Sequence, residues 1–298
     1  MSEIKVTYIL NPVCEKYISR FLFTLYKYQN PEFFRVVLID QVEGRMSSAT
    51  WDYIKDKVHL YIHPPQKQLG FSKSMNEGIL HGLHWGTPLI CLANDDIEIM
   101  DSRWMDGIGK TFALNEKIMG VIPMSPRVAG FGYGVKYNPE VLPYKEEYTK
   151  EEYDYLLRGD FSDVKGLPKT MSTNMKGTVV DGGAFIMPYF KREIFDEIGL
   201  LDERFFPSGG EDYDYLARVY QKGYRIVSTS YSWVYHLWGK SQELNVQGKL
   251  DTPYYQWKPY WNNFGEIWPE GHDIWGFKEV DGKKIPYPRV PEIFVDQI

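Results

Sequence analysis

Short apolar runs alternate with amphipathic helical patterns along the first hundred residues of the chain. Continuous apolar runs of this length are typical of strands buried on both faces, and apolar positions three and four residues apart are typical of helices packed on a sheet. The alternation predicts a parallel sheet with helices on both faces. The predicted strands span residues 4–10, 34–40, 58–64 and 88–99. The predicted helices lie within residues 14–29 and 66–83, and Ser72 or Ser74 can cap the second one.

Regular patterns return near residue 177. A strand is predicted up to Asp181, followed by two glycines, a second strand, and a helix from about Lys191 that Gly199 ends. Another helix follows the glycine pair at 209–210, is closed by Gly223 and leads into a final aromatic strand. Residues 124–173 are rich in Tyr, Gly, Pro and charge, with one short helix predicted at 150–157. This segment is either a lid or acceptor-binding loop, or a surface loop without a role.

Composition narrows the class of protein. With 298 residues, 43% of them hydrophobic and 25% charged, the chain can bury a full core as ordinary globular proteins do. The formal net charge of -6 argues against a nucleic acid as the main partner, because backbone phosphates are bound by basic surfaces. Aromatic residues reach 16% and provide flat surfaces that suit sugar rings as well as a core.

The apolar runs and the cysteines indicate a compartment. No run is long enough for a signal peptide or a membrane span, so we expect a cytoplasmic protein that contacts a membrane only peripherally. Cys14 and Cys91 are far apart in the sequence and flanked by apolar residues. Both are therefore expected to be buried free thiols.

Three acids, Asp95, Asp96 and Glu98, come directly after the fourth apolar run. Two adjacent carboxylates at a strand end repel each other, so a compensating group is expected beside them. Magnesium or manganese would suit, because these cations take oxygen ligands and leave positions open for substrate phosphates. The residues alone leave an alternative open, in which the acids make a turn or cap the next helix.

Other candidates lie in the second half of the chain. Glu211 and Asp212 start a predicted helix, where they either cap it or place a general base near a hydroxyl. The glycines at 182–183, after Asp181, permit either close approach of a ligand or a simple bulge. His236 stands in the last aromatic strand and is either a core residue or a further metal ligand.

These motifs, in this order, resemble the family-2-type glycosyltransferases of the GT-A fold, particularly the rhamnosyltransferase-like branch. The resemblance covers roughly residues 4–123 and 177–241. It is carried by "ILNP", "VVLID", "QLGFSKSMNEGI", "ANDDIEI", "DGGAFIMPYFKREIFDEIGLLDERFF", "GGEDYDYLARV" and "HLWGKS".

The resemblance implies an α/β fold with a Rossmann-like mixed sheet flanked by helices. Residues 1–241 would form the catalytic domain, with a nucleotide-sugar-binding half at 1–123, an insertion at 124–176 and an acceptor and catalytic half at 177–241. Residues 242–298 would be an aromatic extension packed on that domain, and they end in an Asp-Gly hairpin signal at 279–288.

On the donor side, the resemblance places Asn11 and Pro12 at the first strand end. Asp40 matches the acid that reads the pyrimidine of the donor. Gln68 replaces the usual Asn of the motif that continues to Asn76, and both residues are expected to contact the nucleotide-sugar.

The resemblance also implies a metal site for Mn²⁺ or Mg²⁺. Asp96 would be the main ligand, Asp95 would lie beside it or take its place, and His236 would complete the site. Asn94 occupies the first position of the motif and is a candidate donor contact. Lys240 is expected to face the diphosphate.

On the acceptor side, the resemblance implies that Asp212 is the general base, with Glu211 as the second choice. Asp181 and Gly182 would line the space between donor sugar and acceptor. The reaction would transfer a sugar from a UDP-, dTDP- or GDP-linked donor to a hydroxyl of a carbohydrate or another acceptor, with inversion.

Three other functions remain open from the sequence. The protein could bind nucleotide-sugar or glycan without turnover, or it could glycosylate a modified base in DNA. A two-metal nucleotidyl-type transferase is a weaker alternative, because the segment after the first strand is not a glycine-rich basic phosphate loop.

Overall fold

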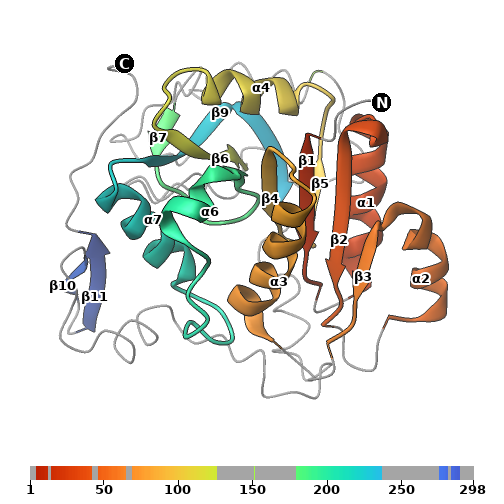
Figure 1. Cartoon of the computed structure of the whole chain (residues 1–298), viewed down its shortest axis with the longest axis horizontal. Coiled ribbons are helices and arrows are strands. Elements are labelled where there is room, and N and C mark those ends of the chain that lie inside the picture. The colour runs from red at the N-terminus through yellow and green to blue at the C-terminus, as the bar shows by residue number, and fades with distance from the viewer. Residues whose placement is uncertain are drawn as a thin grey trace.

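The computed structural model describes residues 5–12, 15–41, 46–64, 69–125, 151, 179–236, 275–280 and 283–288. Its centre is a mixed sheet with the strand order β3-β2-β1-β4-β8-β6-β9-β5, in which β7 also pairs with β9 (Figure 1). The strands are β1 (Val6–Leu10), β2 (Phe34–Ile39), β3 (Leu60–Ile62), β4 (Leu89–Ala93), β5 (Ile97–Ile99), β6 (Ile118–Met124), β7 (Val179–Asp181), β8 (Tyr189–Lys191) and β9 (Arg225–His236). The helices are α1 (Glu15–Tyr28), α2 (Ser48–Ile54), α3 (Gly70–His84), α4 (Trp104–Phe112), α6 (Glu193–Ile198) and α7 (Glu211–Gln221).

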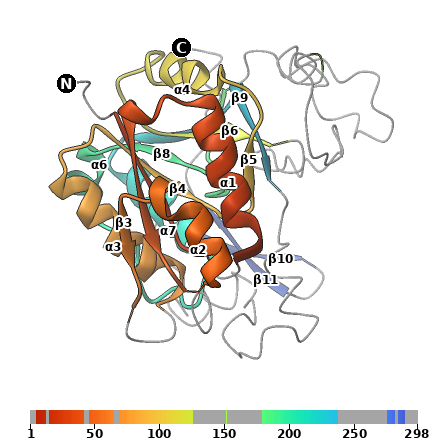
Figure 2. The same ribbon diagram turned by 90° about the vertical axis from the view of Figure 1, so that its right-hand side faces the viewer.

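The first half of the sheet is parallel, as the apolar runs predict. β1 pairs with β2 on one side and β4 on the other, and β2 pairs with β3. Helix α3 packs on β1, β2 and β4, on the opposite side of these strands from α1 (Figure 2). Right-handed crossovers explain this, since the chain moves one way from β1 to β3 and the other way from β3 to β4.

The second half of the sheet turns back on the first. β8 is antiparallel to both β4 and β6, and β6 runs parallel to β9. β9 is twelve residues long, so its first part pairs with β6 and β7 while its last three residues pair with β5. The end of β9 is therefore brought beside the segment that follows β4.

The single strand expected at 88–99 is two strands in the structure. β4 ends at Ala93, and β5 begins at Ile97 and pairs antiparallel with residues 234–236 of β9. A turn at Asp95 and Asp96 separates them. The apolar pattern could not show this break, because Ile97 and Ile99 are as buried as the residues of β4.

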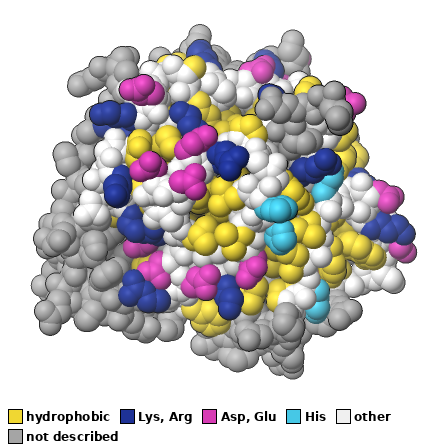
Figure 3. Space-filling view, in the orientation of Figure 1, with side chains coloured by type: hydrophobic (Ala, Val, Ile, Leu, Met, Phe, Trp, Pro, Cys, Tyr) yellow, Lys and Arg dark blue, Asp and Glu magenta, His cyan; other side chains and the backbone are white. Residues whose placement is uncertain are grey.

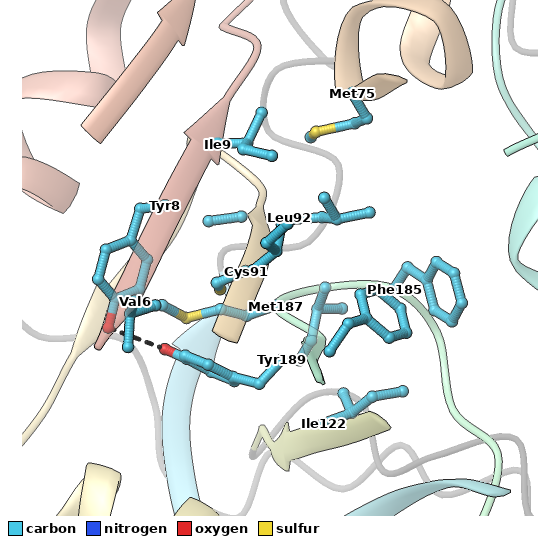
Figure 4. Close-up of a cluster of buried hydrophobic side chains, with 14 of the residues drawn as sticks. Val6, Tyr8, Ile9, Met75, Cys91, Leu92, Ile122, Phe185, Met187 and Tyr189 are labelled. Carbon is cyan, nitrogen blue, oxygen red and sulfur yellow. Dashed lines mark hydrogen bonds between the residues drawn. The ribbon is translucent and has the colours of Figure 1, made fainter. Parts of the chain in front are cut away.

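The core around β1, β4 and β8 combines aliphatic, sulfur-containing and aromatic side chains, with few polar atoms among them (Figure 4). The Tyr189 hydroxyl donates to the Tyr8 hydroxyl at 3.4 Å, and the Tyr8 hydroxyl donates to Gln29 Oε1 at 2.6 Å. Cys91 is buried here as a free thiol, as expected, and burial raises its pKa well above the ordinary value. Cys14 lies outside the described residues.

Several helix expectations need correction. Helix α3 begins at Gly70, so neither Ser72 nor Ser74 caps it; Ser74 Oγ instead donates to the Gly70 carbonyl at 2.6 Å. Helices α2 and α4 were not expected from the pattern, whereas α6 ends at Gly199 with φ 85° as predicted. None of the described helices has both the length and the apolar character needed to cross a bilayer.

The predicted insertion and tail lie mostly outside the described residues. In the tail, β10 (Trp275–Val280) and β11 (Lys283–Pro288) form an antiparallel pair in which Val280 faces Lys283. The expected Asp-Gly hairpin is thus confirmed. On the face of the molecule shown in Figure 3, acidic and basic side chains are interspersed with hydrophobic and uncharged surface.

Candidate active site

The candidate site lies at the carboxyl ends of the parallel strands. Leu10, the last residue of β1, is level with Leu38 in β2 and Ala93 in β4. Asn11 and Asn94 therefore continue two neighbouring strands past the sheet at the same height. Ligands of open α/β sheets bind at this edge, beyond the strand ends.

Asp40 follows β2 and lies next to aromatic side chains. Its side chain is buried, and its Oδ2 atom accepts a 2.5 Å hydrogen bond from the Tyr61 hydroxyl. His63 Nδ1 lies 3.7 Å from the same oxygen, and the Trp51 ring packs on Tyr61 with 4.5 Å between ring centroids. A carboxylate next to flat rings suits a planar base with an N–H group.

The start of helix α3 is joined to the ends of β1 and β2 by side-chain hydrogen bonds. Ser74 Oγ accepts from the amides of Asn11 at 2.9 Å and Gln41 at 3.2 Å. The Gln41 side chain also accepts from the Leu69 N–H at 2.9 Å, and the Gln41 N–H donates to the Pro12 carbonyl at 3.1 Å. These bonds fix the helix start against the donor side of the predicted site.

The turn after β4 meets the end of β9. Asp96 Oδ1 lies 3.0 Å from His236 Nε2, and Asn94 Nδ2 lies 3.5 Å from the same ring nitrogen. Both Asp96 and His236 are buried, with 5% of each residue exposed, and Asp95 is buried beside them at 8%. The His236 backbone N–H donates to Ser125 Oγ at 3.2 Å, which holds the strand end in place.

The Asp96–His236 pair fits two ligands of one divalent cation. Neighbouring ligands of an octahedral ion with metal–ligand bonds of about 2.1 Å lie about 3 Å apart, and the observed distance is 3.0 Å. Among the described residues, no three His, Cys, Asp or Glu side chains form a metal-binding cluster. A cation at this pair would take its other ligands from substrate phosphates and water, as Mg²⁺ and Mn²⁺ do.

Helix α7 presents two acids at its first turn. Gly209 and Gly210 precede it with φ of 105° and 103°, a conformation that glycine adopts without strain. Glu211 folds back, so that its Oε2 atom accepts from the Gly209 N–H at 2.5 Å. Asp212 Oδ1 accepts from the Tyr213 N–H at 2.9 Å.

The two acids have different proton affinities. Burial raises the pKa of Glu211 from its ordinary value of 4.5 to about 8, and the neighbouring Asp212 charge adds to the rise. Burial also raises the pKa of Asp212 from 3.8 to about 6, against the opposing effect of backbone N–H groups, including that of Phe185. The higher proton affinity of Glu211 favours Asp212 as the member of the pair that ionises first as the pH rises. A carboxylate ionised near neutral pH is what a general base requires, so Asp212 remains the first candidate for that role.

The glycine pair after β7 lies next to this helix start. The Gly182 N–H donates to the Ile226 carbonyl at 2.8 Å, and its carbonyl accepts from Ser228 Oγ at 2.6 Å. Gly182 is thereby fixed on β9 with φ 80°. The segment then continues to Phe185, whose backbone N–H bonds to Asp212. The backbone of Asp181 is in β7, and its side chain lies outside the described residues.

Asn76 lies apart from the strand ends. Its amide bonds to the segment between α6 and α7, at Leu201 and Glu203. Gln68 and Lys240 lie outside the described residues.

Sequence reasoning missed the residues that surround the predicted acids. Tyr61 and His63 are two positions apart on and after a short strand, so they point the same way, toward Asp40. That spacing was a usable signal. No local signal could have identified Arg20 of α1, which pairs with Glu98 of β5.

Comparison with known proteins gives distant likenesses. No family model matches the chain. A galactofuranosyl glycosyltransferase of Leishmania donovani is 23% identical over 206 residues, which is 61% of this chain and 43% of that protein. The chain thus spans less than half of the length of this relative.

Solved structures show the same fold at low identity. The mannosyltransferase PcManGT from Pyrobaculum calidifontis, in complex with GDP-Man and Mn²⁺, superposes with a TM-score of 0.53 at 12% identity, covering 91% of this chain and 66% of that one. Residues 1–349 of S. aureus TarS give 0.51 at 12% identity, over 89% and 73%. GalNAc-T7 with UDP, GalNAc and Mn²⁺ gives 0.51 at 13% identity, over 89% and 56%. The mixed, curled sheet of this chain is that of the GT-A fold.

Proposed function

We propose that this protein is a glycosyltransferase that moves a sugar from a nucleotide-diphosphate donor to a hydroxyl acceptor. The observation that carries the proposal is the buried pair of Asp96 and His236, which lie 3.0 Å apart where the segment after β4 meets the end of β9. Asp212 lies at the start of α7, a helix that contacts β9. The galactofuranosyl glycosyltransferase relative and the mannosyltransferase of the same fold support the proposal.

The residues of this chain would have separate roles in the reaction. The acceptor oxygen attacks the anomeric carbon as the bond from that carbon to the diphosphate oxygen breaks. Asp212 takes the hydroxyl proton, so negative charge does not build up on the attacking oxygen. A single in-line displacement of this kind inverts the anomeric centre.

Asp96 and His236 would hold the divalent cation, and Asp95 beside them would be a further candidate ligand. When bound, the cation supplies positive charge that stabilises the departing diphosphate. Asp40, with Tyr61 and Trp51 around it, would receive the nucleobase, and Asn11 and Asn94 would face the rest of the donor.

The donor remains to be assigned within this class. The fold neighbours bind UDP or GDP-Man, and the curated relative is named for galactofuranosyl transfer. A screen should therefore hold UDP-, GDP- and dTDP-sugars, including the deoxyhexose donors used by the rhamnosyltransferase-like branch. Nucleotide release and thermal stabilisation with and without Mn²⁺ would identify the donor, because a saturating ligand raises stability with the logarithm of its concentration.

The variant Asp212→Asn tests the assignment of the base. We expect transfer to fall by about 10²- to 10⁴-fold with donor affinity unchanged, since only the proton acceptor is removed. The exposed acid Asp106, replaced in Asp106→Asn, provides a control with the same loss of charge. Transfer at the wild-type rate by Asp212→Asn would remove Asp212 as the base. Donor binding without any nucleotide release would make the protein a binder.

A further inference from the structure

The Asn76 side chain is used entirely within the protein. Its Nδ2 donates to the Leu201 carbonyl at 2.9 Å and to Glu203 Oε1 at 3.1 Å, and its Oδ1 accepts from the Leu201 N–H at 3.0 Å. An asparagine amide has two N–H groups, so both are taken. With only 3% of the residue exposed, Asn76 offers a bound sugar-nucleotide no donor group.

The segment that Asn76 holds, residues 201–210, leads directly into helix α7 and Asp212. Helix α3 holds the same segment at a second place, where the Phe71 N–H donates to the Pro207 carbonyl at 2.7 Å. The backbone there is close-packed, since a Cβ on Gly70 would lie 2.8 Å from the Phe206 ring. Two contacts, one turn and a half apart on α3, thus fix the approach to α7.

The same helix also fixes the donor side. Ser74, between these two contacts, accepts hydrogen bonds from Asn11 and Gln41 at the ends of β1 and β2. Helix α3 is therefore one rigid element attached at once to the strand ends and to the segment before Asp212. Displacement of a catalytic group by about 1 Å can lower a rate about 100-fold. An element that fixes the position of such a group therefore affects the reaction rate.

We propose that Asn76 is a positioning residue for the transfer reaction. It fixes the position of the 201–210 segment, and with it Asp212, relative to the donor side of the site. The expected changes in kcat rest on the proposed function, whereas the expected changes in hydrogen exchange do not. It replaces the donor contact expected for Asn76 with a contact between the two halves of the site.

The test uses Asn76→Asp, which keeps the size of the side chain and removes both N–H donors. It also sets a carboxylate against Glu203 and the Leu201 carbonyl. We expect the transfer kcat to fall about 10- to 100-fold with the donor dissociation constant within twofold of wild type, measured by calorimetry with Mn²⁺. The double variant Asn76→Asp/Glu203→Gln should recover part of kcat, because the new amide can donate to the introduced carboxylate. Glu77→Gln, an exposed change one residue along α3, is the control.

Hydrogen exchange supplies a readout that needs no catalysis. In Asn76→Asp, backbone amides of residues 201–213 should exchange faster, while those of β1 and β2 keep their protection. If Asn76→Asp does not fold, the exposed change Glu203→Ala removes one of the three hydrogen bonds and should lower kcat about two- to fivefold.

Three results would overturn the proposal. One is a tenfold weaker donor affinity of Asn76→Asp with unchanged kcat, which would make Asn76 a donor contact. Another is unchanged exchange at residues 201–213, and the third is an unchanged kcat in Glu203→Ala. Failure of the wild-type protein to bind or turn over any donor would instead reject the proposed function, and exchange would still decide the role of Asn76.

Discussion

Replacing Glu211 by glutamine should separate the two acids of helix α7. In the wild-type protein Glu211 has a pKa of about 8 and Asp212 one of about 6, so near pH 7 the pair carries one proton, on Glu211. Glutamine is neutral, as protonated Glu211 is, and its side-chain oxygen can still accept a hydrogen bond from the Gly209 N–H. At pH 7, one unit above its pKa, Asp212 is about 90% ionised. We expect Glu211→Gln to keep the pH 7 rate within a few-fold.

The stability of the two proteins should diverge with pH. A carboxyl group whose pKa is higher in the folded state binds more protons there than in the unfolded chain. Stability from this group is therefore lost as the pH rises from 4.5 through about 8. The difference of about 3.5 units corresponds to about 5 kcal/mol, at about 1.4 kcal/mol per unit. Because the two acids are adjacent, the substitution also changes the pKa of Asp212, so the difference in stability between the two proteins reports on the pair rather than on Glu211 alone.

The assays are kcat/KM from pH 5 to 9.5 and urea denaturation at pH 5, 7 and 9. Wild type and Glu211→Gln should both lose activity below about pH 6, as Asp212 is protonated. Only the wild type should lose stability between pH 7 and 9. If Glu211→Gln is as inactive as Asp212→Asn, Glu211 is the base and the assignment is wrong. If its stability falls between pH 7 and 9 as far as that of the wild type, Glu211 is not the protonated member.

Three further changes test other parts of the site. His236→Ala should remove the stimulation of turnover by Mn²⁺ and leave the metal-free rate unchanged, as nucleotide release in EDTA and in Mn²⁺ would show. Tyr61→Phe removes a hydrogen bond to the buried Asp40 carboxylate and should lower the free energy of unfolding by about 1–3 kcal/mol in urea. Gly70→Ala forces a Cβ against an aromatic ring at φ 76° and should lower the melting temperature, whereas Gly109→Ala in α4, with open space around it, should not.

Much of the sheet edge could be predicted because it depends on short-range pattern. The first strands are continuous apolar runs, and polar residues at their ends must fall at one edge when the strands are parallel. Asp40 and the acids at 95–96 directly follow buried apolar runs, and the structure has them after β2 and β4, at that edge. The helix stop at Gly199 also follows from local chemistry, since only glycine takes its backbone angles at no cost.

Pairings between distant segments could not be predicted from local patterns, and the shared site of Asp96 and His236 was implied only by the resemblance. The contact between Asp96 and His236 needs β5 to leave β4 and pair with the end of β9, and no pattern in "ANDDIEIM" marks that departure. The attachment of Asn76 to Leu201 joins residues 125 positions apart. Such contacts depend on which neighbour each strand pairs with in the sheet. That pairing is determined by the packing of the whole chain.

The acids after β4 show how the sequence argument for a cation changes once the structure is known. Asp95, Asp96 and Glu98 together demand compensation, and a metal ion was the simplest source. The protein supplies part of it, because Glu98 is buried against Arg20 of α1 and pairs with it. Glu98 is thereby removed from the charge that a cation must balance. What remains is the charge of Asp95 and Asp96, which are both buried, and the side chain next to Asp96 is the imidazole of His236. A divalent cation shared by Asp96 and His236 would balance that charge, whereas a turn or a helix cap would leave two adjacent buried carboxylates, and for this reason the cation stays in the proposal.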